Sequence, residues 1–167
     1  MYKKLLILIV LVFILISCNK TESGFSIYLT ETNIPIHKAK LLRIHDVSLK
    51  GKPIISINDI NLYNSEQHLI GLKEDALNRL QKMHISLEGK SFVVCVGKKR
   101  IYNGWFYSSL SSVSFDGIVI VKDYIDNSPF MKIQLGYPDK RFYHGEDPRR
   151  QQVIIENLKK HGKLISK

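Results

Sequence analysis

Cysteine is scarce in this chain of 167 residues, which holds only Cys18 and Cys95. Cys18 ends an apolar run near the amino terminus, whereas Cys95 lies inside the strand-like stretch SFVVCVG. A cysteine in apolar surroundings usually packs as a small core residue. No activating base is apparent for Cys95, so we predict a buried thiol and neither a disulfide nor a nucleophile.

The motifs of metal and hydrolytic sites are also missing. The six histidines include no His-Glu-x-x-His pattern, and the chain has no paired cysteines that could hold zinc. The serine cluster at 108–112 lacks the Gly-x-Ser-x-Gly elbow of a serine hydrolase. We therefore predict no metal site and no cofactor.

Apolar runs long enough to cross a membrane are absent as well. The longest, Leu5 to Ile16, has 12 residues and follows Lys3 and Lys4. A spanning helix needs about 20 apolar residues, whereas a signal peptide needs only 7–15 after a short positive segment. The amino terminus therefore predicts an export signal.

The end of this run resembles the lipobox of bacterial lipoproteins, which is Leu, a small or aliphatic residue, Gly, Ala or Ser, and then Cys. Leu15, Ile16, Ser17 and Cys18 match all four positions. The resemblance implies cleavage before Cys18 and attachment of diacylglycerol to its thiol, with palmitate-like acyl chains as the anchor. An ordinary signal peptide or an uncleaved anchor with an incidental cysteine is the alternative.

These features divide the chain into three parts. We expect residues 1–17 to be the lipoprotein signal peptide, 18–24 a flexible tether, and 25–167 a single domain. The protein would then be anchored in the cell membrane or outer membrane, with its domain on the extracytoplasmic side.

Acidic residues are few: 15 oppose 25 lysines and arginines, which gives a formal charge of +10. Loss of Lys3 and Lys4 with the signal peptide would leave +8. Such a charge attracts anionic lipid headgroups or wall polymers. Export argues against nucleic acid as the partner.

The hydrophobic pattern predicts an α+β fold with an antiparallel or mixed sheet packed by two helices. Apolar residues recur at helical spacing over 73–86, and Asp147, Pro148 and Gly162 mark the start and end of a second helix at about 148–161. The predicted strands are 25–30, 38–47, 54–57, 68–72, 91–96, 100–108, 118–123 and 130–138.

Two central segments resemble the head of the first periplasmic domain of the SecDF protein-export factor. They are NDINLYNSEQHLIGLKEDALNRLQ (58–81) and GKSFVVCVGKKRIYNGWF (89–106). The resemblance implies a ferredoxin-like core. The flanks 25–57 and 117–167 do not match, so it implies no shared role in export.

Two segments carry candidate binding residues. In GYPDKRFYHGEDPRR (136–150), Tyr137, Arg141, His144 and Arg149 could form a polar binding loop. In YNGWFYSSLSS (102–112), strand alternation places Trp105 and Tyr107 on one face, which would bind peptide or glycan if exposed. The alternatives are a simple loop leading into a capped helix, and ordinary core.

Two functions remain open on this evidence. The first is an envelope lipoprotein whose domain binds a protein, peptide or wall polymer without catalysis. The second is an envelope enzyme of hydrolase type that uses the 136–150 loop. A deep polar cleft around His144 with a strongly shifted carboxyl pKa would favour the enzyme.

Overall fold

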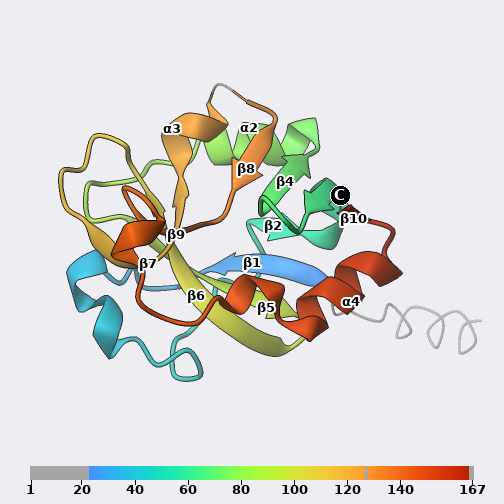
Figure 1. Ribbon diagram of the computed structural model, residues 1–167, viewed down its shortest axis with the longest axis horizontal. Coiled ribbons are helices and arrows are strands. Elements are labelled where there is room, and N and C mark those ends of the chain that lie inside the picture. The colour runs from blue at the N-terminus through green and yellow to red at the C-terminus, as the bar shows by residue number, and fades with distance from the viewer. Residues whose placement is uncertain (1–22, 127, 166–167) are drawn as a thin grey trace, which may run out of the picture.

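The computed structural model describes residues 23–126 and 128–165, which form an α+β fold with two sheets (Figure 1). The strands are β1 (Phe25–Leu29), β2 (Ile55–Ser56), β3 (Ile60–Asn64), β4 (Leu69–Leu72), β5 (Lys90–Val96), β6 (Lys99–Tyr107), β7 (Phe115–Val121), β8 (Phe130–Lys132), β9 (Gln134–Tyr137) and β10 (Leu164–Ile165). One sheet has the order β2-β1-β5-β6-β7-β9 and the other β10-β3-β4-β8. Both are mixed, because β6 pairs with β7 and β10 with β3 in parallel.

Short helices connect and cover these strands. The α-helices are α2 (Glu74–Gln81), α3 (Lys122–Ile125) and α4 (Gln152–Lys160), and the 3-10 helices are η1 (Ile36–Leu41), η2 (Ile57–Asp59), η3 (Lys140–Phe142) and η4 (Pro148–Arg150). This confirms the predicted α+β class.

The main core lies between the two sheets and helices α2 and α4. Phe25, Tyr63, Phe92 and Phe106 are among its fully buried side chains. A smaller cluster on the other face of the six-stranded sheet contains Ile36, Trp105, Tyr107, Val119 and Val121. Burial of apolar area at roughly 25 cal/mol per Å² makes these two clusters the main source of stability.

The predicted strands 91–96 and 100–108 are present and form a hairpin with its turn at Gly97 and Lys98. Strands β5 and β6 pair from Lys90 opposite Phe106 to Val96 opposite Lys99. Gly97 takes φ +58°, a left-handed conformation that glycine adopts without a Cβ clash. The apolar stretch before Gly97 therefore becomes a buried strand, as its β-branched residues predict.

Helix α2 is shorter than the predicted 73–86. It ends at Gln81, and Met83 N donates to Leu80 O in a tighter i to i−3 bond. The residues beyond it, including His84 and Ile85, have only modest helix propensity. Ala76 and Leu80 are the residues that α2 buries.

The second predicted helix is split in two. Asp147 accepts a hydrogen bond from Arg149 N and Pro148 takes the first position, as predicted, but these residues start η4. Gln151 has ψ 135° and separates η4 from α4. At the other end, Gly162 N donates to Lys159 O and Lys163 N to Leu158 O, which together form a Schellman motif.

The strand predicted at 38–47 is wrong. This stretch contains η1 and the turn that follows, and the Arg100 guanidinium donates to Ile44 O at 2.6 Å and to Val47 O at 2.7 Å. Leu41 is exposed, so the apolar residues read as a strand do not share a buried face. The segment instead covers the smaller cluster from outside.

The prediction of one sheet is also corrected to two. Helix α2 leaves β4 in the four-stranded sheet and leads to β5 in the six-stranded one. In a ferredoxin-like core, strands joined in this way would share a sheet. The helix therefore bridges two layers, because its buried face packs into the core between them. Among the described residues, no helix is long and apolar enough to cross a membrane.

Candidate functional site

The loop from Pro138 to Gln151, between β9 and α4, separates two clefts. Glu146 and Pro148 line one, while Asp147 and Arg149 line the other. From Glu146 to Arg149, consecutive residues of the loop therefore face alternate clefts. The first volume is about 610 Å³ and the second about 950 Å³.

The first cleft, which we call the β6–β7 cleft, opens where these two strands stop pairing. They are hydrogen bonded only over Trp105–Tyr107 and Val119–Val121. The lining comprises the following residues: Ala39, Lys40, Tyr102, Asn103, Trp105, Phe115, Asp116, Gly117, Ile118, Tyr143, His144, Gly145, Glu146 and Pro148. It combines half-buried rings with carboxylate, amide, imidazole and ammonium groups.

Tyr102 is the most unusual member of this lining. It is 5% exposed, and its hydroxyl has no hydrogen-bond partner in the described part of the chain. A buried polar group without a partner costs about 1–3 kcal/mol. Burial raises the pKa of Tyr102 well above 10, so the hydroxyl keeps its proton and can donate or accept.

His144 lies at the rim of the β6–β7 cleft. Its backbone N donates to Asp116 Oδ1 at 3.0 Å, and its Nδ1 lies 3.2 Å from Asp116 Oδ2. The hydrogen bond from the His144 backbone N is the main cause of the lowered pKa of the Asp116 carboxyl. The His144 side chain is 76% exposed, so the pair is solvated and contributes little to stability.

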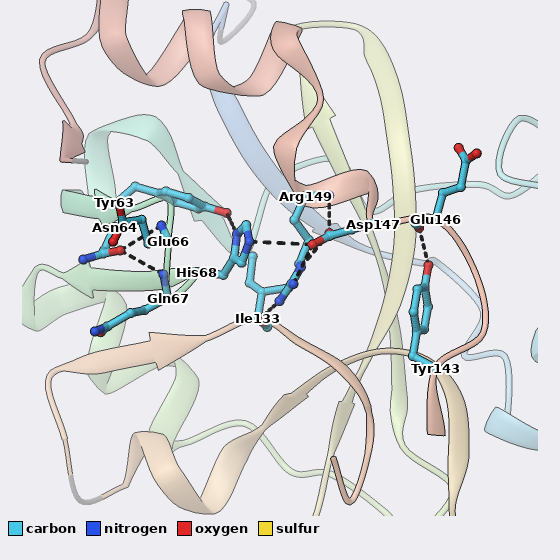
Figure 2. A network of polar contacts seen from close by, with 10 residues as sticks. All are labelled: Tyr63, Asn64, Glu66, Gln67, His68, Ile133, Tyr143, Glu146, Asp147 and Arg149. Atoms are coloured by element: carbon cyan, nitrogen blue, oxygen red, sulfur yellow. Dashed lines mark hydrogen bonds and ion pairs between the residues drawn. The ribbon is translucent and has the colours of Figure 1, made fainter. Parts of the chain in front are cut away.

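The second cleft, which we call the Arg149 cleft, has a buried polar floor (Figure 2). Arg149 donates from Nε and a terminal nitrogen to the two Asp147 oxygens, at 2.8 and 2.7 Å, and from its other terminal nitrogen to Ile133 O at 2.7 Å. The neighbouring His68 places Nε2 3.8 Å from Asp147 Oδ2 and Nδ1 3.0 Å from the Tyr63 hydroxyl. These contacts tie the loop to strands of the four-stranded sheet.

The protonation states of this floor follow from burial and from Arg149. Burial lowers the pKa of His68 to about 4, which leaves the ring neutral near pH 7. The hydrogen bond from Arg149 lowers the pKa of Asp147 to about 2. Burial raises the pKa of Tyr63, so the Tyr63 phenol stays protonated. The floor is thus a fixed arrangement with one ion pair.

His68 also has φ 53°, which is uncommon for a residue with a side chain. It closes the turn between β3 and β4, and its carbonyl accepts from Ile133 N at 3.0 Å. The surrounding contacts hold it in this sparsely populated conformation. Its ring is directed inward as a result, toward Asp147 (Figure 2).

Trp105 and Tyr107 do not form an exposed platform. They share one face, as alternation predicts, but are 1% and 0% exposed because the 34–42 segment covers them. Trp105 Nε1 donates to Ile34 O at 2.7 Å, and the Tyr107 hydroxyl lies 2.6 Å from Ser111 Oγ. Trp105 still contributes to the wall of the β6–β7 cleft.

The four candidate residues of the 136–150 loop are dispersed. The Tyr137 hydroxyl donates to Ser109 O at 3.1 Å, which is a structural contact. Arg141 is exposed and pairs with Asp139. His144 lines the β6–β7 cleft and Arg149 the Arg149 cleft, so the loop serves two sites.

Other predicted features lie elsewhere. Cys18 and the signal peptide fall outside the described residues. Cys95 is buried, as predicted, and burial raises its pKa to about 11. Within 23–126 and 128–165, no group of three His, Cys, Asp or Glu residues could hold a metal ion.

Several residues of the two clefts were not predicted from the sequence. Tyr63 and Tyr102 have the appearance of core residues in strands, and Asp116 that of a turn residue before glycine. His68 precedes an ordinary apolar strand. The partners of His68 and Asp116 are distant in the sequence: Asp147 follows His68 by 79 positions, and His144 follows Asp116 by 28.

Comparisons with protein-family models, with curated proteins and with solved structures returned no match.

Proposed function

We propose that this chain is a lipid-anchored binding domain of the bacterial cell envelope, attached through Cys18 and without catalytic activity. The lipobox-like sequence supports the anchor. The composition of the β6–β7 cleft supports binding, and it is the observation on which the proposal rests.

That cleft offers hydrogen-bonding groups from three parts of the chain around partly exposed rings. Asn103 comes from β6, Asp116 from β7 and Glu146 from the loop, beside the rings of Phe115 and Tyr143. Planar carboxylates and amides recognise hydroxyl and amide groups, and aromatic faces pack on apolar ligand surfaces. The expected ligand is therefore an envelope protein, peptide or wall glycan.

The lining of the cleft contains no Ser, Thr or Cys that could act as a nucleophile. This supports binding over covalent catalysis.

The only tryptophan of the chain, Trp105, lines the cleft and can report on binding. We expect soluble peptidoglycan fragments, titrated into the protein, to shift Trp105 emission. Glu146→Gln and His144→Ala should each weaken the titration about fivefold or more, which corresponds to the loss of about one hydrogen bond. Lys140→Gln, in the same loop but in the other cleft, is the matched control.

An unchanged emission up to millimolar fragment, together with no partner cross-linked in membranes above the Cys18→Ala control, would count against a binding role for this cleft.

One observation favours a second candidate, an envelope hydrolase. Asp116 contacts His144 Nδ1, and a carboxylate in this position can orient a histidine as a general base. The test is hydrolysis of p-nitrophenyl acetate by the protein and by His144→Ala. Turnover that depends on His144 would support the hydrolase, whereas equal, background-level rates would support the binding domain.

A further inference from the structure

The start of the described chain is held between α4 and the β5–β6 turn. Asn157 Nδ2 of α4 donates to Ser23 O at 3.2 Å, and Phe25 N donates to Asn157 Oδ1 at 2.8 Å. From the turn, Gly97 N donates to Gly24 O at 3.1 Å. The described chain therefore begins beside these two elements.

Four lysines lie within three positions of Gly97 or Asn157 in the sequence. Lys98 and Lys99 follow Gly97 in the turn, while Lys159 and Lys160 close the last turn of α4. All four are exposed, and none forms an ion pair with a carboxylate of the described residues. We call this set the tether-exit face.

Glu156 of α4 offsets only part of the positive charge of these lysines. The Glu156 carboxylate accepts a hydrogen bond from Gln152 Nε2 at 2.6 Å, one turn before the end of the helix. Together with Glu22, which precedes Ser23 in the sequence, two carboxylates stand against four ammonium groups, so the charge of the face is positive.

The length of chain before Ser23 limits how far this face can be from an anchor. Five peptide links separate Cys18 from Ser23, and a chain extends at most about 3.6 Å per residue. With lipid on Cys18, Ser23 lies within about 18 Å of the membrane surface. At physiological salt the screening length is about 8 Å, so only charges close to this end are strongly attracted.

We propose that the tether-exit face docks on the anionic lipid headgroups of the membrane that holds the anchor. This inference rests on the proposed lipid attachment. It orients the domain, because β1 runs from the tether-exit face toward the end where η1 lies (Figure 1). The β6–β7 cleft, whose lining includes Ala39 and Lys40 of η1, then faces away from the bilayer and toward its ligand.

The test separates docking from anchoring by using protein without lipid. Every strand and both core clusters lie within 25–165, so a chain from position 18 with Cys18→Ser contains the whole described fold. Its binding is measured by co-sedimentation with vesicles of phosphatidylcholine alone and with 30% phosphatidylglycerol. The same measurement is made on Lys98→Glu/Lys99→Glu.

The matched control is Lys50→Glu/Lys52→Glu, which makes the same charge change away from the face. The Lys50 backbone N donates to Leu29 O at the far end of β1. Leu29 lies roughly 13 Å from Phe25 along this strand. We expect binding only to the anionic vesicles, about tenfold weaker for the Lys98/Lys99 variant and changed less than twofold for the control.

Equal losses in the two variants, or equal binding to both vesicle types, would overturn the docking. Tighter binding to soluble polyphosphate than to vesicles, with the same dependence on Lys98 and Lys99, would replace the lipid by an anionic polymer. None of these outcomes bears on lipid attachment. A separate measurement, the mass of the amino-terminal peptide of the native protein, tests that attachment.

Discussion

His68 combines burial, an uncommon backbone conformation and an anionic neighbour. Its ring is neutral near pH 7 because burial disfavours the charged form more strongly than Asp147 favours it. Arg149, Arg150 and Lys132, which also face the ring, disfavour its charged form further. The ring therefore fits the floor of the Arg149 cleft only while it is unprotonated.

This predicts a defined loss of stability in acid. The pKa of His68 falls from 6.5 unfolded to about 4 folded, so the unfolded chain binds the proton first. The free energy of unfolding is highest above pH 6.5 and decreases as the pH falls to 4, by about 3 kcal/mol, because the folded chain resists the protonation that the unfolded chain accepts. Urea unfolding between pH 7 and 4 measures the decrease.

His68→Asn should remove most of this slope, since asparagine tolerates positive φ and does not titrate. The control is His84→Asn, which alters an exposed histidine outside the network. A slope that survives in the His68 variant would show that another group causes it.

The two buried tyrosines predict opposite effects of the same substitution. The Tyr63 hydroxyl bonds to His68, whereas that of Tyr102 has no partner among the described residues. Tyr63→Phe should destabilise by about 1 kcal/mol, and Tyr102→Phe should be neutral or stabilise by a similar amount. Urea unfolding at pH 7 compares them, and equal destabilisation would contradict the assignment of Tyr102 as unpaired.

At the scale of elements, the loop contains the same local motif twice. In Asp139–Arg141 and in Asp147–Arg149, the aspartate accepts from the backbone N and from two guanidinium nitrogens of the arginine two positions later. Only the second arginine is buried, and only it also bonds to Ile133 O. The second motif should therefore hold the loop, while the first only shapes its surface.

We predict that Asp147→Asn lowers the free energy of unfolding by about 2 kcal/mol, because it removes the charge that pairs with buried Arg149. The partial exposure of Asp147 keeps the loss below that of a fully buried pair. Asp139→Asn should leave stability nearly unchanged, because its motif is exposed. Similar thermal or urea unfolding of the two variants would refute the distinction.

Local signals predicted the elements well where the sequence itself determines them. The Gly97 turn, the Asp147 cap and the Gly162 end all lie where turn and cap chemistry place them. The prediction failed at 38–47, since a run of Lys and Leu indicates a strand only if its apolar residues share a buried face. Its actual structure depends on Arg100, more than 50 positions away.

At the scale of the whole molecule, the sequence predicted the α+β class but not the division into two sheets. Which strands pair is decided by contacts between distant segments, such as β10 with β3 and β1 with β5. The clefts depend on the same long-range arrangement, so Tyr102 and Asp116 could not be recognised as neighbours of His144. Strand alternation correctly predicted that Trp105 and Tyr107 share one face. It did not predict that residues 34–42 cover this face and bury both side chains.

The proposed features combine into one picture, a lipid-anchored domain with a basic face near the membrane and a polar cleft away from it. The anchor and the tether-exit face would set the orientation, and the loop with its buried Arg149 would hold the cleft open. Each part has its own test, and the proposed orientation at the membrane depends on lipidation at Cys18.

The most direct measurement is the mass of the amino-terminal peptide of the protein extracted from membranes of the native cell. We expect a peptide that begins at Cys18 and carries diacylglycerol on its thiol, with a longer unlipidated precursor in the Cys18→Ala variant. A peptide that retains Met1–Ser17, or one with an unmodified Cys18 thiol, would contradict it.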